Sequence, residues 1–415
     1  MENVIGLVGI AAIMGMALLM SNNRKAINWR TPLVGLSLQA IICAFVLFLP
    51  LTKEFFLLLA AGLDHLLSAT VQGGEFILNK QLVEDQFIFA VRIGLAIIFV
   101  SSLSALLFYL RVTQFVVKGA ARFLTKSLGI SGAEAVSTAA AVFVGQVECQ
   151  VLIKPYLPKL TPSQLFCSLT AAMATISGAS LLAYISVGMN PTFLIAASIQ
   201  SAINGIVVAK IVFPETDAKA LAGEVELAQA HEYHGALDAM TQGALQDGWQ
   251  IARNVVIMVA MAVTYIALLN TILGAAAHPF GITLTLQDIL GWVFSPVAYI
   301  IGVPWHEAFH SGRLMGTEIS LNEFAAYGEL SKVIAGTASY TMSPRTQMIT
   351  TMALCGFCNL GSMAINIGGL GAMAPERRKE ISGMVFRALI AANFATWISA
   401  ATAGLLYSLS HTIGM

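Results

Sequence analysis

The stretch that decides the fold runs from Ser131 to Leu160 and reads SGAEAVSTAAAVFVGQVECQVLIKPYLPKL. It is apolar enough to enter a membrane, yet Gly145-Gln146-Val147-Glu148 interrupts it in the middle. A second stretch, from Leu286 to about Tyr327, is interrupted by Gly302-Val303-Pro304-Trp305. Irregular backbone is tolerated at membrane depth only where protein or a water-filled cavity surrounds it. Each stretch therefore predicts a re-entrant hairpin of two half-helices with an unwound tip.

The composition of the whole chain indicates a membrane protein. Of its 415 residues 57% are hydrophobic and 11% are charged, against about 25% charged residues in a soluble domain. Crossing a hydrocarbon core takes ~20 helical residues, and eight apolar windows have about this length: 4–21, 32–51, 88–110, 164–188, 191–213, 251–276, 346–373 and 383–408. We predict an all-α polytopic protein with eight transmembrane helices in a lipid bilayer. The 22 basic and 22 acidic residues cancel, which leaves no cationic face for nucleic acid.

Three clusters of basic residues predict one topology. They lie between the first two windows (Arg24, Lys25 and Arg30), after the third (Arg111 to Lys126) and after the seventh (Pro375 to Lys379). Basic residues near the ends of spans mark the cytoplasmic side. With these clusters inside, both termini lie outside, the first hairpin enters from inside, and the second enters from outside.

The order of elements repeats, because a hairpin followed by two spans occurs twice. Inverted repeats with broken helices are typical of secondary transporters, whose substrate site lies near the midplane. No G-x-x-x-x-G-K-[ST] motif for nucleotide phosphates occurs. The sequence predicts four parts. Residues 1–128 form scaffold helices 1–3, with interfacial helices at Lys53 to Leu78 and Val112 to Leu128. Residues 129–213 form transport repeat 1, residues 214–280 form a polar linker (214–234) and scaffold helix 6, and residues 281–415 form transport repeat 2.

Two pairs of polar residues lie in the hairpins, Gln146 with Glu148 at the first tip and Asn322 with Glu323 late in the second hairpin. A carboxylate inside a membrane is costly unless it is paired or hydrogen-bonded, and such residues are functional by default. Amides donate and accept, while carboxylates accept from hydroxyl and N–H groups. The pattern fits a neutral ligand that is rich in hydroxyl and ring N–H groups. The alternative is that each Glu faces water or pairs with a nearby lysine such as Lys332.

Two of the spans contain polar interruptions of their own. The seventh carries Cys355-Gly356-Phe357-Cys358-Asn359-Leu360-Gly361-Ser362, and the fourth carries Thr175-Ile176-Ser177-Gly178-Ala179-Ser180. Glycine weakens a helix, and residues at i and i+3, such as Asn359 and Ser362, share a face. Small residues in membrane helices are also common packing contacts, which is the alternative for Ser180 and its neighbours.

One motif favours a different class of protein. His306-Glu307-Ala308-Phe309-His310 matches H-E-x-x-H, in which two histidines hold zinc and the glutamate activates water. An intramembrane zinc metalloprotease is therefore the competing hypothesis. No distal third-ligand motif accompanies these residues, so we expect neither an enzyme nor a bound cofactor.

Five blocks of sequence resemble the bacterial concentrative nucleoside transporters. They are Gly145-Gln146-Val147-Glu148 followed by Lys154-Pro155-Tyr156; Gly302-Val303-Pro304-Trp305 with Glu307-Ala308; Asn322-Glu323-Phe324 followed by Tyr327; Cys355-Gly356-Phe357 with Asn359 and Ser362; and Ala374-Pro375-Glu376-Arg377-Arg378. The resemblance implies eight spans, two opposed hairpins, three interfacial helices and a homotrimer in the bacterial inner membrane, with periplasmic termini. It also implies a cation-coupled symporter that imports nucleosides by an elevator motion.

The resemblance also assigns roles to individual residues. It implies that the nucleobase is bound by Gln146, Val147, Glu148 and Ser180, that the ribose is bound by Glu323, Asn359 and Ser362, and that Phe357 shapes the pocket. Family members often have Thr at the Val147 position and a small apolar residue at the Ser180 position. The preference between purine and pyrimidine, and even a different polar neutral solute, therefore stays open.

The coupling ion stays open as well. In sodium-coupled members an Asn five residues before the hairpin Gln helps to hold sodium, with a Ser and backbone carbonyls. The corresponding positions here are Ala141, Val144, Thr175 and Ile176. Losing the Asn oxygen removes a hard ligand, so both Na⁺ and H⁺ are expected candidates. If protons are used, Glu148 or Glu323 is the natural carrier.

Overall fold

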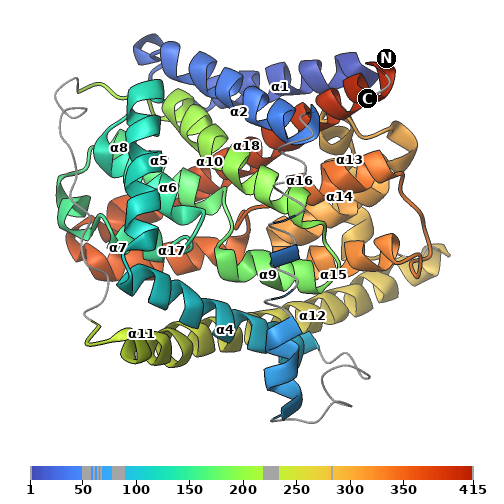
Figure 1. Ribbon diagram of the computed structural model, residues 1–415. Helices are drawn as coiled ribbons and strands as arrows, with labels where there is room; N and C mark the ends of the chain where they lie inside the picture. The colour runs from blue at the N-terminus through green and yellow to red at the C-terminus, as the bar shows by residue number, and fades with distance from the viewer. Residues whose placement is uncertain are drawn as a thin grey trace.

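The structure, a computed structural model, describes residues 2–48, 58, 61–62, 65, 68–76, 89–217, 233–281 and 284–413. These residues form helices joined by loops, without a strand among them (Figure 1). The predicted interfacial stretch Lys53 to Leu78 and the polar linker 214–234 lie largely outside the described residues. The helices before the first repeat are α1 (Glu2–Leu19), α2 (Arg30–Phe48), α4 (Phe89–Tyr109) and α5 (Val112–Leu128).

The two repeats each contain five α-helices in the described residues, with a 3-10 turn after the second helix in the first repeat and after the fourth helix in the second. The first comprises α6 (Gly132–Ala141), α7 (Glu148–Val151), η3 (Lys154–Lys159), α8 (Pro162–Met173), α9 (Gly178–Ser186) and α10 (Pro191–Val212). The second comprises α14 (Trp305–Ser320), α15 (Glu323–Ile334), α16 (Pro344–Ala353), α17 (Leu360–Met373), η7 (Pro375–Arg377) and α18 (Arg378–Ile413). Between α10 and α14 lie α11 (Ala236–Gln242), the π-helical turn η5 (Gly243–Gly248), α12 (Trp249–Ala277), η6 (His278–Phe280) and α13 (Leu286–Ile300), the last of which falls within the predicted second repeat 281–415.

Each of the eight predicted windows coincides with a helix or with a pair of helices, which confirms the all-α fold class. In the described part of the chain, three helical segments are long and apolar enough to cross a membrane unaided: Pro162–Ser186, Pro191–Val212 and Pro375–Ser408. The number is five if the bent pairs α4–α5 (77°) and α13–α14 (119°) each count as one span. Among the described residues, four of the other windows overlap with shorter apolar helices: Ile5–Leu19, Arg30–Val46, Val263–Ala277 and Leu360–Met373.

The predicted tip of the second hairpin is wrong in one respect. The break at Gly302-Val303-Pro304-Trp305 exists and separates α13 from α14. A second break at Leu321 and Asn322 separates α14 from α15, and this break is the counterpart of the one that precedes α7. The hydropathy pattern revealed the first break through Gly302 and Pro304, whereas the second contains no glycine or proline to mark it.

Two long helices, α10 and α18, pack against each other at the centre of the molecule. Asn204 Nδ2 and Ser201 Oγ of α10 lie 2.9 and 3.0 Å from Ser399 Oγ of α18. A Cβ on Gly205 would lie 2.8 Å from Ala171 Cα of α8, so only glycine permits this approach. Small residues and side-chain hydrogen bonds are how membrane helices associate closely.

The first repeat also contains a buried ion pair. Lys210 Nζ of α10 contacts Glu134 Oε1 of α6 and donates to Ser163 Oγ at 3.0 Å. Glu134 also accepts from the Ser131 N–H at 2.9 Å in the capping box that begins α6. Two buried charges are tolerated when they are paired and hydrogen-bonded in this way. The pair joins the start of the first hairpin to the central helix.

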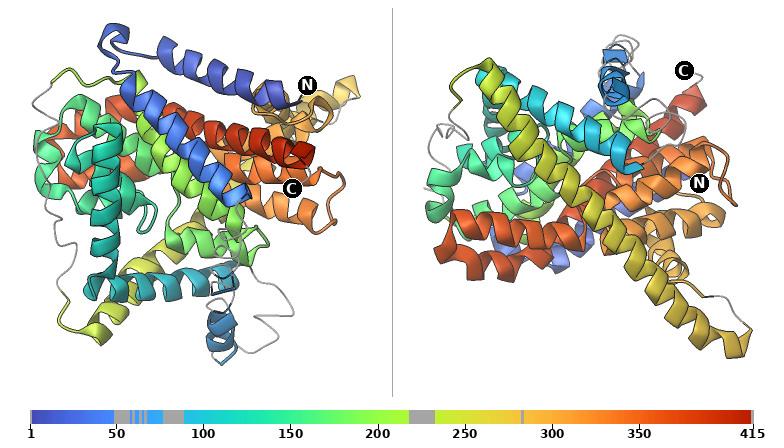
Figure 2. Two further views of the ribbon diagram at one scale, coloured as in Figure 1. Left: turned by 45° about the horizontal axis from the view of Figure 1, so that its top comes forward. Right: turned by 90° about the horizontal axis from the view of Figure 1, so that it is seen from below.

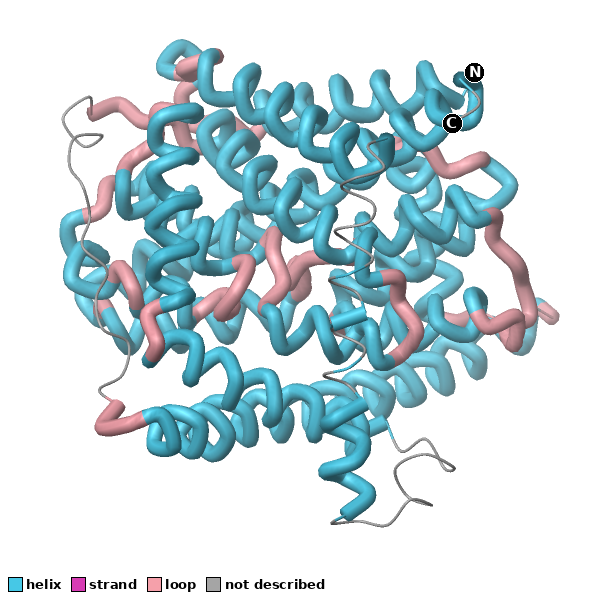
Figure 3. Tube along the Cα trace, in the orientation of Figure 1, coloured by secondary structure: helices cyan, strands magenta, loops and turns pink. Residues whose placement is uncertain are grey.

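The outer helices cover this centre on two sides. Helices α1 and α2 lie along one side, and α4 and α12 cross the opposite side (Figures 1 and 2). Gly6 of α1 approaches Ala401 of α18, and Arg387 donates to the Met20 carbonyl, so α1 and α18 run antiparallel. Loop segments lie in the interior, between helices (Figure 3). The breaks in the helices thus meet inside the protein, as irregular backbone in a membrane requires.

Candidate functional site

Four half-helices begin at one central cavity. Glu148 and Glu323 are the first residues of α7 and α15, while Ser177 and Asn359 are the N-caps of α9 and α17. All four side chains line the same cavity. The first turn of a helix carries unpaired N–H groups and a partial positive charge. The cavity is therefore surrounded by donors from helix ends and by two acidic side chains.

The cavity has a volume of about 330 Å³, within the ~300–1,000 Å³ of small-molecule sites. The structure brings together around it all eight residues that the sequence analysis nominated for substrate: Gln146, Val147, Glu148, Ser180, Glu323, Phe357, Asn359 and Ser362. They come from both hairpins and from the breaks in the fourth and seventh spans. The two repeats thus contribute to one cavity.

Glu323 is held by neutral donors. Its side chain is buried, with Tyr184 donating to Oε1 at 2.9 Å and Asn359 Nδ2 donating to Oε2 at 2.7 Å. The alternative that this carboxylate faces water or pairs with Lys332 is therefore wrong. Tyr184 does not line the cavity, so it positions the carboxylate from behind.

Gln146 links the first hairpin to the seventh span. Its Nε2 donates to Ser362 Oγ at 3.2 Å, and its Oε1 accepts from Asn366 Nδ2 at 2.8 Å. The Ser362 N–H donates to Asn359 Oδ1 at 2.8 Å. A chain of hydrogen bonds therefore runs from the tip of one hairpin through α17 to Glu323. Asn366 was missed by the sequence analysis, although it follows Asn359 and Ser362 at the spacing of one helix face.

Glu148 differs from Glu323 because its side chain is exposed to the cavity. Glu148 is the first residue of α7, so its side chain stands at the turn that begins this helix. A Cβ on Gly145 would lie 2.7 Å from Glu148 Oε2, and Gly145 has a φ of +119°. The turn thus needs glycine both for its backbone and for the space that the carboxylate fills.

The breaks in the fourth and seventh spans are joined to each other. The Phe357 N–H donates to the Thr175 carbonyl at 3.2 Å, and the Gly178 N–H donates to the Phe143 carbonyl at 3.0 Å. Ser180 N donates to Ser177 Oγ at 3.2 Å. The polar interruptions that the sequence analysis identified are therefore real helix breaks, and the bond from Phe357 to Thr175 joins them across the repeat interface.

One wall of the cavity was missed by the sequence analysis. It comes from the end of η5 and the start of α12, through Asp247, Gln250, Ile251, Asn254 and Val255. The signal was available, because Asp247, Gln250 and Asn254 follow one another at i, i+3 and i+7 on one helix face. The sequence analysis assigned the segment that contains them to the scaffold. The cavity therefore lies between the two repeats and a helix outside them.

The chain matches three family models. Residues 8–81 match the N-terminus and residues 193–404 the C-terminus of the Na⁺ dependent nucleoside transporter, while residues 90–190 match a nucleoside recognition domain. The chain belongs to the concentrative nucleoside transporter family. It is thus a multi-pass membrane transporter and not an enzyme, which confirms the predicted class.

Relatives and solved structures agree along nearly the whole length of the transporter. It is 38% identical to an uncharacterized transporter of Haemophilus influenzae, with 97% of each chain covered, and 34% identical to the nucleoside permease NupC of Helicobacter pylori, with 99% of each covered. It is 32% identical to the sodium/nucleoside cotransporter 1 of Mus musculus over 98% of this chain and 64% of that protein. Among solved structures, CNTnw in an inward-facing substrate-bound state is 37% identical, with a TM-score of 0.92 and 99% of each chain covered.

The residues of this transporter that correspond to the family's sodium site offer few oxygen atoms that could bind a cation. Ala141 ends α6 and has no side-chain oxygen. The Thr175 hydroxyl donates to the carbonyls of Ala171 and Ala172 at 3.2 and 3.1 Å. The Thr175 carbonyl already accepts from Phe357. Val144 lines the central cavity, whereas Ile176 is buried.

The zinc hypothesis fails on the geometry of the H-E-x-x-H segment. The His306 side chain is 80% exposed, and Glu307 accepts from the Ser343 N–H and hydroxyl at 2.8 and 2.9 Å. His310 stacks on Tyr340 with ring centroids 4.0 Å apart. No cluster of three or more His, Cys, Asp or Glu side chains suited to a metal occurs among the described residues. Glu307 thus stabilises the N-terminus of α16.

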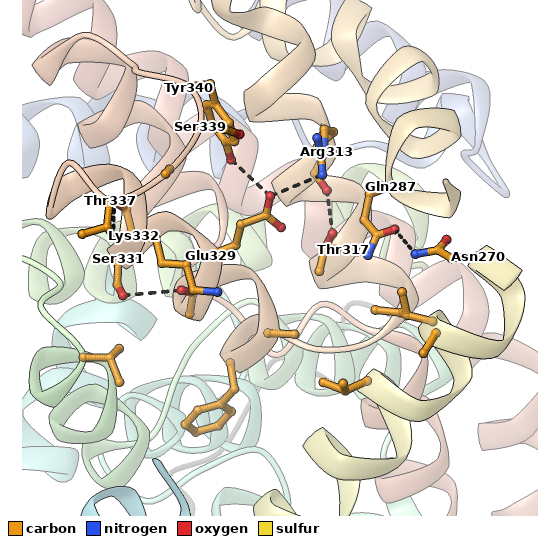
Figure 4. Close-up of a pocket in the computed structure, with 18 residues that line it drawn as sticks. Asn270, Gln287, Arg313, Thr317, Glu329, Ser331, Lys332, Thr337, Ser339 and Tyr340 are labelled. Atoms are coloured by element: carbon orange, nitrogen blue, oxygen red, sulfur yellow. Dashed lines mark hydrogen bonds and ion pairs between the residues drawn. The ribbon is translucent and has the colours of Figure 1, made fainter. Parts of the chain in front are cut away.

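A larger hollow of about 1000 Å³ lies outside the central cavity, between α12, α13, α14 and α15 (Figure 4). Its polar side chains bind one another: Tyr340 donates to Glu329 Oε1 at 3.2 Å, and Arg313 lies 3.5 Å from the same oxygen. Phe324 lines both spaces and separates them. None of the eight nominated residues lines the larger hollow, so we assign the candidate substrate site to the smaller central cavity.

Proposed function

We propose that this transporter is a cation-coupled symporter that imports nucleosides across a bacterial inner membrane. The observation that supports the proposal most strongly is the continuous chain of hydrogen bonds from Gln146 through Ser362 and Asn359 to Glu323. Amides and carboxylates in one cavity suit a neutral ligand with ring nitrogens at one end and hydroxyls at the other. The permease of Helicobacter pylori and the cotransporter of Mus musculus are named for nucleosides.

Each wall of the cavity has a proposed role. The first hairpin and α9 bind the nucleobase through Gln146, Val147, Glu148 and Ser180. The second hairpin and α17 bind the ribose hydroxyls through Glu323, Asn359 and Ser362, and Phe357 restricts the shape. Glu323 suits the ribose because its two donors leave lone pairs on an ionised carboxylate for further hydroxyl donors.

Transport is proposed to occur by an elevator motion within a homotrimer. The repeats 129–213 and 281–415 move together, while 1–128 and 214–280 stay fixed in the bilayer with the termini periplasmic. The position of the cavity between the repeats and α12 supports this division, because motion along α12 would expose the site on either side. CNTnw has been solved in both inward-facing and outward-facing states.

The coupling ion is proposed to be Na⁺ or H⁺. The family description favours sodium. The absence of a side-chain oxygen at Ala141 and the internal bonding of Thr175 favour protons. Uptake measured with sodium replaced by choline at fixed pH, and separately with a proton ionophore, distinguishes the two: the ion whose gradient is required is the coupling ion.

Uptake of radiolabelled uridine and adenosine into proteoliposomes tests the proposed substrate. We expect Glu148→Gln and Glu323→Gln to abolish most uptake, because each removes a charged acceptor from the cavity. Glu329→Gln, in the larger hollow, is the matched control and should retain uptake. Unchanged uptake in both cavity variants would refute the site. Strong competition by sugars or free bases, with none by nucleosides, would indicate another polar neutral solute.

A further inference from the structure

A second buried carboxyl group lies behind the candidate site. Glu318, on the last turn and a half of α14, is 0% exposed. Neither of its carboxylate oxygens has a hydrogen-bond partner among the described residues. It does not line the central cavity, but the charge of Glu323, which does line it, acts on Glu318. The two acids therefore influence each other while only one can touch a ligand in the cavity.

The groups around Glu318 do not neutralise it. From α15 it interacts with Glu323 and Tyr327, and from the break between α16 and α17 with Cys355 and Cys358. Tyr327 directs its hydroxyl to the Thr351 carbonyl at 2.9 Å, and Cys358 Sγ lies 3.3 Å from the Met173 carbonyl. These groups are acids or neutral donors that are already committed elsewhere.

The charged side chains on the other neighbouring elements are also engaged. On α13, Asp288 lies 3.7 Å from Arg313, and Tyr299 packs edge-on against Trp305. On α16, the Arg345 guanidinium donates to the Gly302 carbonyl and to Ser408 Oγ. The arginines of α14 and α16, Arg313 and Arg345, are thus bound to other partners.

Glu318 is costly in either protonation state. An ionised carboxylate that is buried without a donor or counter-charge carries a large desolvation penalty, and a buried neutral acid without partners still loses its hydrogen bonds with water. An aliphatic side chain of similar size would pack here at lower cost. A group that destabilises the resting fold in this way requires a functional explanation.

We propose that Glu318 is the proton-binding site of the transporter and that its protonation favours nucleoside binding through Glu323. With Glu318 protonated, Glu323 can remain ionised and accept from Tyr184, Asn359 and a ribose hydroxyl. With Glu318 ionised, the like charge opposes an ionised Glu323 and weakens that acceptor. A proton taken up outside thus binds together with a nucleoside and is released inside when the nucleoside leaves. The inference rests on the proposed role of Glu323.

The proposal predicts a specific pH dependence of binding. Because a proton on Glu318 strengthens nucleoside binding, the affinity should rise as pH falls, and by linkage the nucleoside should raise the affinity for the proton. Coupling of this kind typically changes affinity by ~5- to 150-fold. Glu318→Gln mimics the protonated state permanently, so the variant should lose the rise in affinity with falling pH that Glu318 causes, and any pH dependence that remains reports on Glu148 and Glu323, which line the cavity.

Calorimetric titration of uridine and adenosine into the purified transporter, from acidic to mildly alkaline pH, tests this prediction. We expect wild-type affinity to fall at least about fivefold with rising pH and Glu318→Gln to lack this fall. Glu329→Gln is the control and should retain the wild-type profile. Glu318→Leu is the second variant, in case a buried amide impairs folding, and should lack the fall as well. A wild-type profile in either Glu318 variant would overturn the proposal.

Two further measurements test the proton-binding site independently of the proposal that nucleosides are the substrate. In proteoliposomes, Glu318→Gln should exchange nucleosides at equal concentration but fail to accumulate them against a gradient; full accumulation would contradict the proposal. In the absence of substrate, the infrared band of a protonated carboxylic acid should be smaller in Glu318→Gln than in wild type, and an unchanged band would show that Glu318 holds no proton. If wild type shows the infrared band but does not bind nucleosides, nucleosides are refuted as the substrate, whereas Glu318 is still supported as the proton-binding site.

Discussion

Two buried tyrosines, Tyr184 and Tyr327, lie with ring centroids 4.6 Å apart, but they serve different partners. Tyr184 donates to Glu323, whereas Tyr327 donates to the Thr351 carbonyl. A hydrogen bond to a charged group contributes about 1.5–3 kcal/mol. We therefore expect Tyr184→Phe to weaken nucleoside binding roughly tenfold to a hundredfold, measured as the dissociation constant of the purified transporter.

Tyr327→Phe is the matched control for this residue-scale prediction. It removes a hydroxyl of the same kind from the same buried cluster without changing the donors of Glu323. Its nucleoside affinity should stay close to that of wild type. Equal losses of affinity in the two variants would mean that packing of the rings, and not the donor to Glu323, determines the effect.

At the scale of elements, the turn that begins α7 depends on glycine. Gly145 has a φ of +119°, and a Cβ there would lie 2.7 Å from Glu148 Oε2. Gly188 has a φ of +96° with no atom within 4 Å of its Cβ position. Both alanine substitutions place a side chain in a backbone region that costs ~1–2 kcal/mol. Only Gly145→Ala also displaces the carboxylate.

We therefore expect Gly145→Ala to lose most nucleoside uptake in proteoliposomes, while Gly188→Ala keeps uptake per folded molecule near wild type. Thermal unfolding of the purified variants corrects for the shared backbone cost. Wild-type uptake by Gly145→Ala would show that the position of Glu148 in this structure is not required for transport.

At the scale of the whole molecule, the proposed motion requires α9 to slide past α4. These helices pack against each other, and Ala105 and Ala179 line a small hollow between them. Joining cysteines at these two positions with a short bifunctional thiol reagent should trap one state and stop uptake, and a cleavable reagent should restore it on reduction. The same reagent applied to the transporter without the added cysteines measures the background from its five native cysteines, which are buried as Ala105 and Ala179 are.

A cross-link within one moving part is the control for the elevator. Ser311 Oγ of α14 and Thr350 Oγ1 of α16 lie 2.8 Å apart inside the second repeat. Cysteines joined at these positions should leave transport intact, because the repeat moves as one unit. Full transport with the Ala105–Ala179 link in place would contradict the proposed division of the chain.

The sequence by itself determined the helical windows, three of the four helix breaks that surround the cavity, and most of its nominated polar residues, whereas Val147 and Phe357 were nominated through the resemblance alone. These features can be recognised in the sequence because the spans of a membrane protein must be long and apolar. A polar residue within such a span differs clearly from its neighbours. The resemblance to a family then assigned roles to residues such as Gln146 and Glu323 that hydropathy could only mark as unusual.

Only the tertiary structure decided which polar groups share one cavity and which do not. That Asn366 binds Gln146 and that α12 forms a wall of this cavity was decided once distant segments were placed together. Glu318 and Glu323 are five residues apart and equally acidic in sequence, yet one has two donors and the other has none among the described residues. The physical reason is that the state of a buried carboxylate depends on partners from other helices, and local sequence does not specify them.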